Sequence, residues 1–251
     1  MNISGNTILI TGGGSGIGRA LAEALHKAGN QVVIAGRREA LLHEVTSANP
    51  GMEALLLDIQ DKDDVAAFAR QAVESFPALN TVIHNAGIMR SEVVAAGDFL
   101  DTAEETIATN LLGPIRLTSA LLPHLLKQER AAILTVSSGL AFVPLATTPT
   151  YSAAKAAIHS WSMALREQLK ATSVEVIEIA PPYVQTELLG PQQAVDPAAM
   201  PLAEFTSEVM ALLESQPESG EIIVERCKPL RFAAENGQLG AIFAQLAAQH
   251  G

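Results

Sequence analysis

Residues 11–18 read Thr-Gly-Gly-Gly-Ser-Gly-Ile-Gly and separate two segments of different periodicity. Residues 6–10 are mostly apolar and β-branched, which predicts a strand. After Gly16, apolar residues recur at helical spacing until Gly29, where we expect the helix to stop. This order brings free backbone N–H groups and the positive end of the helix dipole to one point. That arrangement favours binding of an anionic pyrophosphate, although a turn that binds no ligand is the simpler alternative.

Strand-like apolar runs alternate with helical stretches along the rest of the chain. Such alternation predicts an α/β fold: a single-domain, doubly wound (Rossmann-type) parallel sheet of about seven strands with helices on both faces. In such a sheet the ligand lies at the carboxyl ends of the strands. No linker or repeat interrupts residues 1–251, so we expect one domain. The expected strands cover residues 6–10, 32–35, 54–57, 81–84, 132–136, 174–179 and 221–224.

Two of the expected helices carry capping signals. Asp61 is expected to cap the helix that follows it. Thr102 with Glu105 forms a predicted capping box for a second, longer helix. Pro114 and Pro123 fall within this longer helix, and we expect them to bend it or interrupt its hydrogen bonding.

The composition limits the functional classes. Of the 251 residues, 48% are hydrophobic, and the net charge is −11 with no basic cluster beyond Arg37 and Arg38, so nucleic acid is not an expected partner. Cys227 is the only cysteine, which excludes an intrachain disulfide and a cysteine–histidine metal cluster, and we expect no metal. The first residues lack a basic signal region and no apolar stretch has membrane-spanning length. The sequence therefore predicts no membrane partner and a cytoplasmic location.

Three residues form a candidate proton-transfer set. Lys155 follows Tyr151 by four positions at the start of a predicted helix, so both lie on one face, and Ser138 precedes Tyr151 by thirteen. A cation about 4 Å from a phenolate contributes on the order of 4 kcal/mol at an effective dielectric of about 20, or roughly three pKa units. We therefore expect Lys155 to bring the pKa of Tyr151 into the range for general acid–base catalysis, although an isolated pair of this kind is usually an ordinary surface pair. Ser137 is expected to bond the backbone at a strand end and is the alternative to Ser138.

In this order, the motifs resemble those of the short-chain dehydrogenase/reductase superfamily, from the first strand to about Thr186. The resemblance implies an NAD(P)(H)-dependent oxidoreductase that transfers hydride between the nicotinamide and a carbonyl or alcohol, with Tyr151 as general acid or base. It also implies that Lys155 holds the nicotinamide ribose, Ser138 binds the substrate oxygen and Asn110 supports a water chain. The other matching segments are His84-Asn85-Ala86-Gly87, Pro181 and Thr186.

The chain departs from the family pattern in three places. His84 replaces an asparagine and is expected to be structural, and Pro182 replaces a glycine and should stiffen its loop. The tail, residues 226–251, lacks the family's Asp-Gly-Gly ending and predicts a short terminal helix, so the tetramer contacts that the family builds from its C-terminus are in doubt. This tail resembles that of oxidoreductases linked to D-alanine transfer onto teichoic acids.

The end of the second strand indicates the cofactor. Relatives that prefer NAD carry an acidic side chain there, where this chain has Gly36. Arg37 and Arg38 follow, and a guanidinium holds a phosphate through two charge-assisted hydrogen bonds, to which Ser15 would add its hydroxyl. NADP(H) is therefore favoured, with NAD(H) as the alternative if Arg37 stacks on adenine; Asp58 is expected near the adenine. The full expected cofactor set is Thr11, Gly12, Gly14, Ser15, Gly16, Ile17, Gly18, Arg37, Arg38, Asp58, Ile59, Asn85, Ala86, Gly87, Tyr151, Lys155, Pro181, Val184 and Thr186.

The substrate pocket is expected to be mainly apolar. A lid near residues 186–206 holds several prolines and small apolar residues, and such a pocket favours a hydrophobic ketone, aldehyde or secondary alcohol. For each residue the alternative is simple packing within the domain. The expected substrate residues are Met89, Leu140, Phe142, Tyr183 and Leu188.

We expect a homodimer or homotetramer, packed through the helices that contain Asn110 and Tyr151. This expectation rests partly on the family resemblance. It also rests on the helix that contains Asn110, whose apolar residues cover more of its surface than one narrow buried stripe. The alternative function is a nucleotide-binding redox sensor or regulator with the same fold. Loss of Tyr151 or Lys155 would have favoured that alternative, and both are present.

Overall fold

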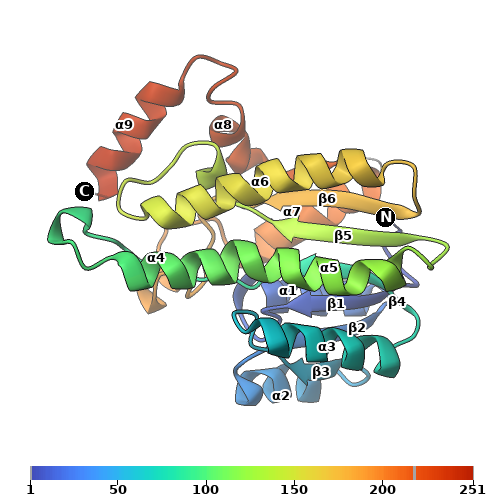
Figure 1. Cartoon of the computed structure of the whole chain (residues 1–251). Helices are drawn as coiled ribbons and strands as arrows, with labels where there is room; N and C mark the ends of the chain where they lie inside the picture. Colours follow the sequence, from blue (N-terminus) through green and yellow to red (C-terminus); the bar gives the residue numbers. More distant parts are fainter. Residues whose placement is uncertain (1, 217–218, 251) are drawn as a thin grey trace.

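Seven parallel strands form one sheet in the computed structural model, which describes residues 2–216 and 219–250. The spatial order is β3-β2-β1-β4-β5-β6-β7, which confirms the predicted doubly wound fold (Figure 1). The predicted strand positions are also confirmed, with ends that differ by no more than two residues. The strands are β1 (Thr7–Thr11), β2 (Gln31–Gly36), β3 (Glu53–Leu56), β4 (Leu79–His84), β5 (Ala131–Val136), β6 (Val174–Ala180) and β7 (Glu221–Ile223).

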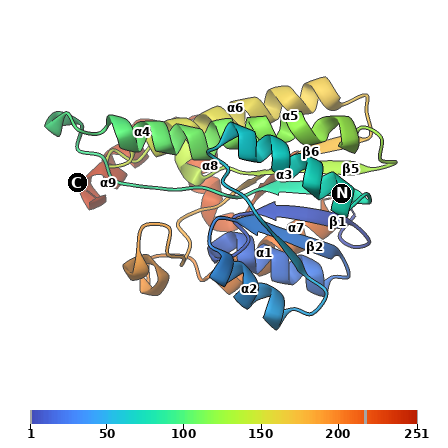
Figure 2. The same ribbon diagram turned by 60° about the horizontal axis from the view of Figure 1, so that its bottom comes forward.

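Helices cover both faces of the sheet, as Figure 2 shows. The strands are buried on both faces because their side chains alternate: in β1, Ile8 and Ile10 belong to one core and Leu9 to the other. The first core is closed by α1 (Gly16–Lys27), α2 (Glu39–Ala48) and α7 (Leu202–Ser215). The second is closed by α3 (Lys62–Ser75), α5 (Gly113–Leu125) and α6 (Pro149–Leu169).

The strand order reverses beside β1. The chain first builds outward through β2 and β3, then crosses back so that β4 pairs with the other edge of β1. The loops after β1 and β4 therefore diverge, which leaves a crevice at the carboxyl ends of these strands. This crevice is where a doubly wound sheet binds its ligand.

The capping expectations have mixed outcomes. Asp61 caps α3, because its side chain accepts hydrogen bonds from the backbone of Asp63 and Asp64. The capping box at Thr102 is wrong: α4 (Leu100–Ile107) begins earlier, and the backbone N–H of residue 103 already bonds the carbonyl of Phe99. Thr102 therefore lies inside the first turn.

The long helix after residue 100 is interrupted, as expected from its prolines. A π-helical segment, residues 108–112, separates α4 from α5 just before Pro114. Pro114 has no N–H, so it cannot donate the α-helical hydrogen bond to the carbonyl four residues earlier. Pro123 lies within α5, which continues to Leu125.

The tail folds into two helices beyond the sheet. After β7 come α8 (Lys228–Arg231) and α9 (Leu239–His250), and the second confirms the predicted terminal helix. In Figure 1, α9 stands outside the layers near the carboxyl ends of the strands, far from the N-terminus. Among the described residues, no helix combines the length and apolar character needed to cross a bilayer.

Candidate active site

One large cavity, of about 1180 Å³, opens at the carboxyl ends of the strands. Its wall includes the glycine turn after β1, the end of β2, the loops after β4, β5 and β6, the start of α6 and part of α9. Most of the expected site residues lie on this wall. They are Thr11, Gly12, Gly14, Ser15, Gly16, Ile17, Arg37, Arg38, Ile59, Asn85, Ala86, Gly87, Met89, Ser138, Leu140, Tyr151, Lys155, Pro181, Tyr183, Val184, Thr186 and Leu188.

The glycine turn is locked to the loop after β4. Thr11 Oγ1 accepts hydrogen bonds from the backbone N–H groups of Asn85 and Ala86, both at 3.1 Å. The Asn85 amide in turn donates to the carbonyl of Thr11 at 3.1 Å. A Cβ on Gly12 would lie 2.9 Å from Ala86 Cα, and Gly12 has a φ of +68°. The two loops can approach this closely only because this position is glycine.

Gly18 has a packing role rather than a place on the cavity wall. It is buried in α1, and a Cβ there would lie 2.3 Å from both the Asn85 amide nitrogen and the Gly12 carbonyl oxygen. Gly18 therefore supports the turn from behind by letting α1 pack against it.

The end of β2 presents two exposed arginines to the cavity. Arg38 donates a 2.7 Å hydrogen bond from Nη2 to Ser15 Oγ, the residue that precedes α1. Gly36 also lines the cavity, and no acidic side chain stands there. These residues fit the phosphate end of a nicotinamide dinucleotide, since a guanidinium, a hydroxyl and the N-terminus of α1 face one volume.

The proton-transfer set lies at the opposite end of this volume. Tyr151 and Lys155 come from the first turns of α6, and Ser138 follows β5. Ser138 hydrogen-bonds the Tyr151 hydroxyl, while Lys155 Nζ donates to the Val136 carbonyl at 2.7 Å and lies 5.6 Å from the Tyr151 ring centroid. Ser137 donates to the Ile179 carbonyl at 3.4 Å, a bond to strand backbone of the kind expected for it.

Burial governs the titration of this set. It raises the pKa of Tyr151 to about 12, while the Ser138 hydrogen bond acts in the opposite direction. It lowers the pKa of Lys155 to about 8, and Glu178 acts in the opposite direction. The direction for Tyr151 is opposite to the one expected, because loss of water around the buried phenolate outweighs a lysine whose ammonium is bonded to Val136.

Asn110 holds the loop after β4 from the π-helical segment. Its side-chain oxygen accepts from Ile88 N–H at 2.9 Å, and its amide donates to the Ile88 carbonyl at 2.8 Å. Both amide groups are thus used, and Asn110 itself lies behind the cavity wall. A Cβ on Gly87 would lie 3.3 Å from Asn110 Oδ1 and 3.7 Å from Lys155 Nζ, so the lysine, the asparagine and this loop meet at one point.

Two other expected contacts lie off the cavity wall. Asp58 accepts a 3.0 Å hydrogen bond from Gln60 N–H, and the cavity wall is formed by its neighbours Leu57 and Ile59. Phe142 packs its ring against His159, at 4.8 Å between centroids, and below the Arg231 guanidinium. Phe142 was expected to touch substrate, but it packs against the core closed by α1, α2 and α7, because the chain turns after residue 141.

His84 is structural, as expected. Its Nε2 shares a 2.8 Å hydrogen bond with Thr118, and full burial lowers its pKa to about 3. The neutral imidazole therefore joins β4 to α5 within the core.

Apolar side chains from distant segments surround Tyr151. Met89, Leu145 and Tyr151 form a buried cluster, and Leu189 and Leu246 pack against it. The spacing of the apolar residues in α9 predicted a helix, but no sequence signal placed that helix here. Wall residues that were not expected include Arg90, Leu145, Leu189, Gln193, Asp196, Leu230, Leu246 and Gln249.

The expected lid is a folded segment. It contains a 3-10 helix, Pro191–Val195, and Gln193 is buried inside it. The Gln193 amide donates to the Val184 carbonyl at 2.8 Å, and its oxygen accepts from Leu189 N–H at 2.8 Å. The Gln193 side chain therefore ties this segment to the loop that follows β6.

A charged cluster lies beneath α6, behind the proton-transfer set. His159 Nδ1 lies 2.8 Å from Glu178 Oε2, whose carboxylate is fully buried, and Glu221 lies beside them. Both Glu221 oxygens accept hydrogen bonds from Arg231, at 2.8 and 3.3 Å. The guanidinium therefore already balances the charge of the Glu221 carboxylate. The Glu178 hydrogen bond raises the pKa of His159, and burial raises that of Cys227 to about 12.

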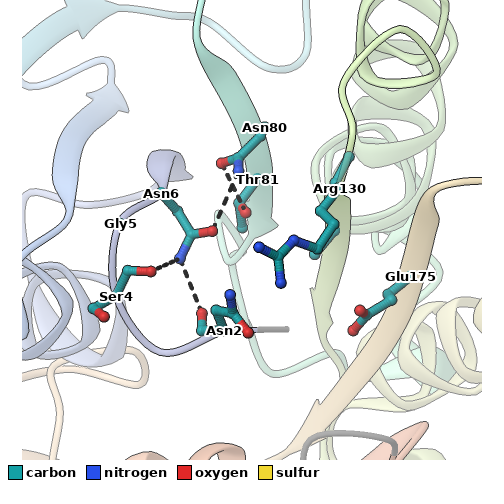
Figure 3. A pocket seen from close by; sticks show the side chains of 10 residues that line it. Asn2, Ser4, Gly5, Asn6, Asn80, Thr81, Arg130 and Glu175 are labelled. Carbon is teal, nitrogen blue, oxygen red and sulfur yellow. Dashed lines mark hydrogen bonds between the residues drawn. The ribbon is translucent and has the colours of Figure 1, made fainter.

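A second, small cavity of about 80 Å³ lies at the amino ends of the strands. Figure 3 shows Asn6 on its wall, where the amide donates to the carbonyls of Asn2 and Ser4 and accepts from Asn80. These bonds tie the start of the chain to β4. Ligands of doubly wound parallel sheets bind at the carboxyl ends of the strands, so we interpret this hollow at the amino ends as structural.

Comparisons with known proteins bear on both the fold and the large cavity. Residues 6–196 match the family model described as short chain dehydrogenase. The uncharacterized oxidoreductase DltE of Bacillus subtilis (strain 168) is 42% identical over 239 residues, which cover 93% of each chain. A solved short chain dehydrogenase from Burkholderia cenocepacia J2315, in complex with NADP, has a TM-score of 0.81 at 28% identity and covers 98% of this chain and 99% of its own. One from Burkholderia phymatum, in complex with NAD, has a TM-score of 0.83 at 21% identity over 96% of both chains and shows the shared fold.

Proposed function

This chain belongs to the short-chain dehydrogenase/reductase family and is a nicotinamide-dependent oxidoreductase, and from that premise we propose a specific reaction. The protein transfers hydride between NADP(H) and a carbonyl or secondary alcohol that carries an apolar substituent. The observation that carries this proposal is one cavity with Tyr151, Ser138 and Lys155 at one end and Arg37 and Arg38 at the other.

Tyr151 is the general acid of the reduction. When bound, the cofactor supplies the hydride and, once oxidised, a positive charge. The buried phenol of Tyr151 is protonated at neutral pH and can therefore donate to the substrate oxygen, provided that the phenolate left behind is stabilised. Ser138 Oγ, already bonded to the phenol, donates to the same oxygen and orients it.

Lys155 stabilises the phenolate that proton donation leaves. Its ammonium remains largely charged near neutral pH even with a pKa of about 8, and it lies on the same helix face as Tyr151. Asn110 acts as a positioning residue, since both of its amide groups hold Ile88 and with it the loop that faces Lys155. The water chain that family resemblance assigns to Asn110 stays a prediction.

NADP(H) is the proposed cofactor. The Ser15 hydrogen bond holds the Arg38 guanidinium above the glycine turn, and Arg37 lies beside it on the cavity wall. A 2′-phosphate placed there would meet two cations, whereas an NAD-type acidic partner for the ribose hydroxyls is absent at Gly36.

The test is a panel of ketones, aldehydes and secondary alcohols, assayed with NADPH and NADH or their oxidised forms. We expect turnover of apolar carbonyl compounds with a higher kcat/KM for NADPH. A higher kcat/KM for NADH would overturn the cofactor assignment and leave the reaction class intact. Tight dinucleotide binding without turnover across the panel would favour the redox-sensor alternative.

We also propose a homodimer or homotetramer packed through α4, α5 and α6. Apolar side chains on or next to these helices remain exposed in the single chain: Leu112 between α4 and α5 by 38%, Leu126 just after α5 by 43% and Met163 on α6 by 51%. Burial of such residues between two copies would stabilise an assembly. Light scattering at micromolar concentration tests this, and a monomeric mass would refute it.

A further inference from the structure

The terminal helix α9 contributes to the cavity wall. Leu246 and Gln249 line the cavity, and Leu246 packs against the apolar cluster that contains Tyr151. Both residues lie outside residues 6–196, which match the family model. They therefore belong to the part of the chain that follows the matched segment.

Only one edge of α9 is packed. The helix contains no Asp, Glu, Lys or Arg, yet Leu239 and Phe243 are each 39% exposed. A helix that is apolar around most of its surface usually packs against other parts of the protein. In α9, the packed side is the one that faces the cavity. Leu246 lies on the packed edge, whereas Phe243 does not line the cavity.

The connection to α9 is tight on its α8 side. Ala233 is fully buried, and its carbonyl accepts from Gln238 N–H at 2.7 Å. Gly237 has a φ of +69°, which turns the chain back toward the carboxyl ends of the strands. The turn thereby directs α9 back toward the cavity wall, on which Leu246 and Gln249 lie.

We propose that α9 is the wall that selects the apolar substituent of the substrate, with Leu246 in contact with that substituent above Tyr151. This inference rests on the proposed reductase function and deepens it. The preferred substrates are carbonyl compounds whose substituent is long enough to pass from the tyrosine hydroxyl to Leu246. Four other apolar walls, Met89, Leu140, Leu145 and Leu189, complete the same compartment.

A turnover test compares methyl ketones of increasing chain length, from propanone to decanone, with NADPH. Leu246→Ala should lower kcat/KM about tenfold or more for the long ketones and little for propanone. Leu246→Trp should exclude the long ketones and keep the short ones. Phe243→Ala, on the exposed side of the same helix, is the matched control and should change neither. All variants should bind NADPH as the wild type does in a fluorescence titration, so a general folding defect would be visible.

A second test does not depend on turnover. Cys227 is fully buried, so Leu246→Cys introduces an accessible thiol at the cavity wall, and Phe243→Cys introduces one on the outside of α9. With NADP+ present, a long secondary alcohol should slow alkylation of the first thiol about tenfold or more and leave the second unchanged; isopropanol should protect neither.

The two tests separate the failures. Equal effects of the Leu246 variants on short and long ketones, or absence of protection at Leu246→Cys, would overturn the role of α9. Protection at Leu246→Cys without turnover of any carbonyl compound would support the role of α9 and overturn the proposed reaction instead.

Discussion

At the cofactor end of the cavity the wall is largely backbone, whereas at the substrate end it consists of side chains from distant segments. The glycine turn and the loop after β4 meet closely enough that a Cβ at Gly12 or Gly18 would clash with backbone or with Asn85. The substrate end is built from Leu145, Leu189 and Leu246, which come from three separate loops or helices. We infer that substitutions at the cofactor end mainly change the stability of the fold, whereas substitutions at the substrate end mainly change substrate binding.

The largest effect is expected at the substrate end, where Tyr151 is the proposed proton donor. Tyr151→Phe keeps the ring that packs with Met89 and Leu145 but removes the proton donor. We expect kcat to fall by about 10²- to 10⁴-fold while NADPH affinity stays close to that of the wild type. Steady-state kinetics and a binding titration check this.

The other tyrosine offers a matched control for that variant. Tyr183 lines the same cavity, but its hydroxyl bonds Asp196 at 3.1 Å. Tyr183→Phe should therefore lose far less kcat than Tyr151→Phe. Near wild-type kcat in Tyr151→Phe would refute the proposed mechanism.

The second effect concerns cofactor choice at the backbone end. Removing the guanidinium in Arg38→Ala should raise KM for NADPH about 10- to 100-fold and change KM for NADH little, since hydrogen bonds to charged groups contribute about 1.5–3 kcal/mol. Gly36→Asp should shift preference toward NADH, and its new Cβ has room, with Leu42 Cδ2 as the nearest heavy atom at 3.8 Å. Kinetics with both cofactors measure the ratio, and equal losses for NADPH and NADH would contradict a phosphate-specific role.

Two helical glycines give the third test, which addresses stability. Gly18→Ala should destabilise the protein by about 1–3 kcal/mol through overpacking against Asn85 and the Gly12 carbonyl. Gly240→Ala, in α9 with nothing within 4 Å of its added Cβ, should be neutral or stabilise by up to about 1 kcal/mol. Thermal unfolding of the two variants measures the difference. Equal melting temperatures would show that the glycine turn accommodates a Cβ at residue 18 without loss of stability.

The smallest effect is the pH dependence of stability from the cluster beneath α6. Because Glu178 raises the pKa of His159, protonated His159 stabilises the fold below the ordinary histidine pKa near 6.5, and this contribution is lost as pH rises through the folded value. Glu221, Arg231 and the nearby Lys155 also face this group and set its charge balance.

Melting temperatures between about pH 5.5 and 8.5 measure this contribution. The advantage of the wild type over His159→Gln should shrink as pH rises, and Glu178→Gln should remove the same pH dependence. A constant difference across the range would contradict the assignment.

The cofactor end was predictable because its signals are local in sequence. A strand, a glycine turn and a helix occupy residues 7–27, and the strands were placed by short apolar runs. The start of α4 was predicted wrongly from Thr102, because the backbone hydrogen bond of residue 103 to the Phe99 carbonyl begins the helix before the expected cap. The titration of Tyr151 was also predicted in the wrong direction, since burial cannot be seen in a spacing of four residues.

The substrate end was predicted only in part. Met89, Leu140, Tyr183 and Leu188 lie on the cavity wall, but Phe142 packs into the core. Leu246 was placed in a helix by periodicity, yet its position above Tyr151 depends on a turn at Gly237 and on contacts over long sequence separation. No local pattern encodes such contacts.

The opposite positions of the chain ends bear on how the enzyme is handled in practice. The first described residues lie at the amino ends of the strands, held by Asn6 and Asn80 (Figure 3), whereas Gln249 lies on the cavity wall. An affinity tag, a fluorescent fusion or a surface linker attached at the N-terminus leaves the mouth of the cavity open. The same attachment beyond Gln249 would begin close to the cavity wall, so we expect apparent substrate preferences to depend on which end carries it.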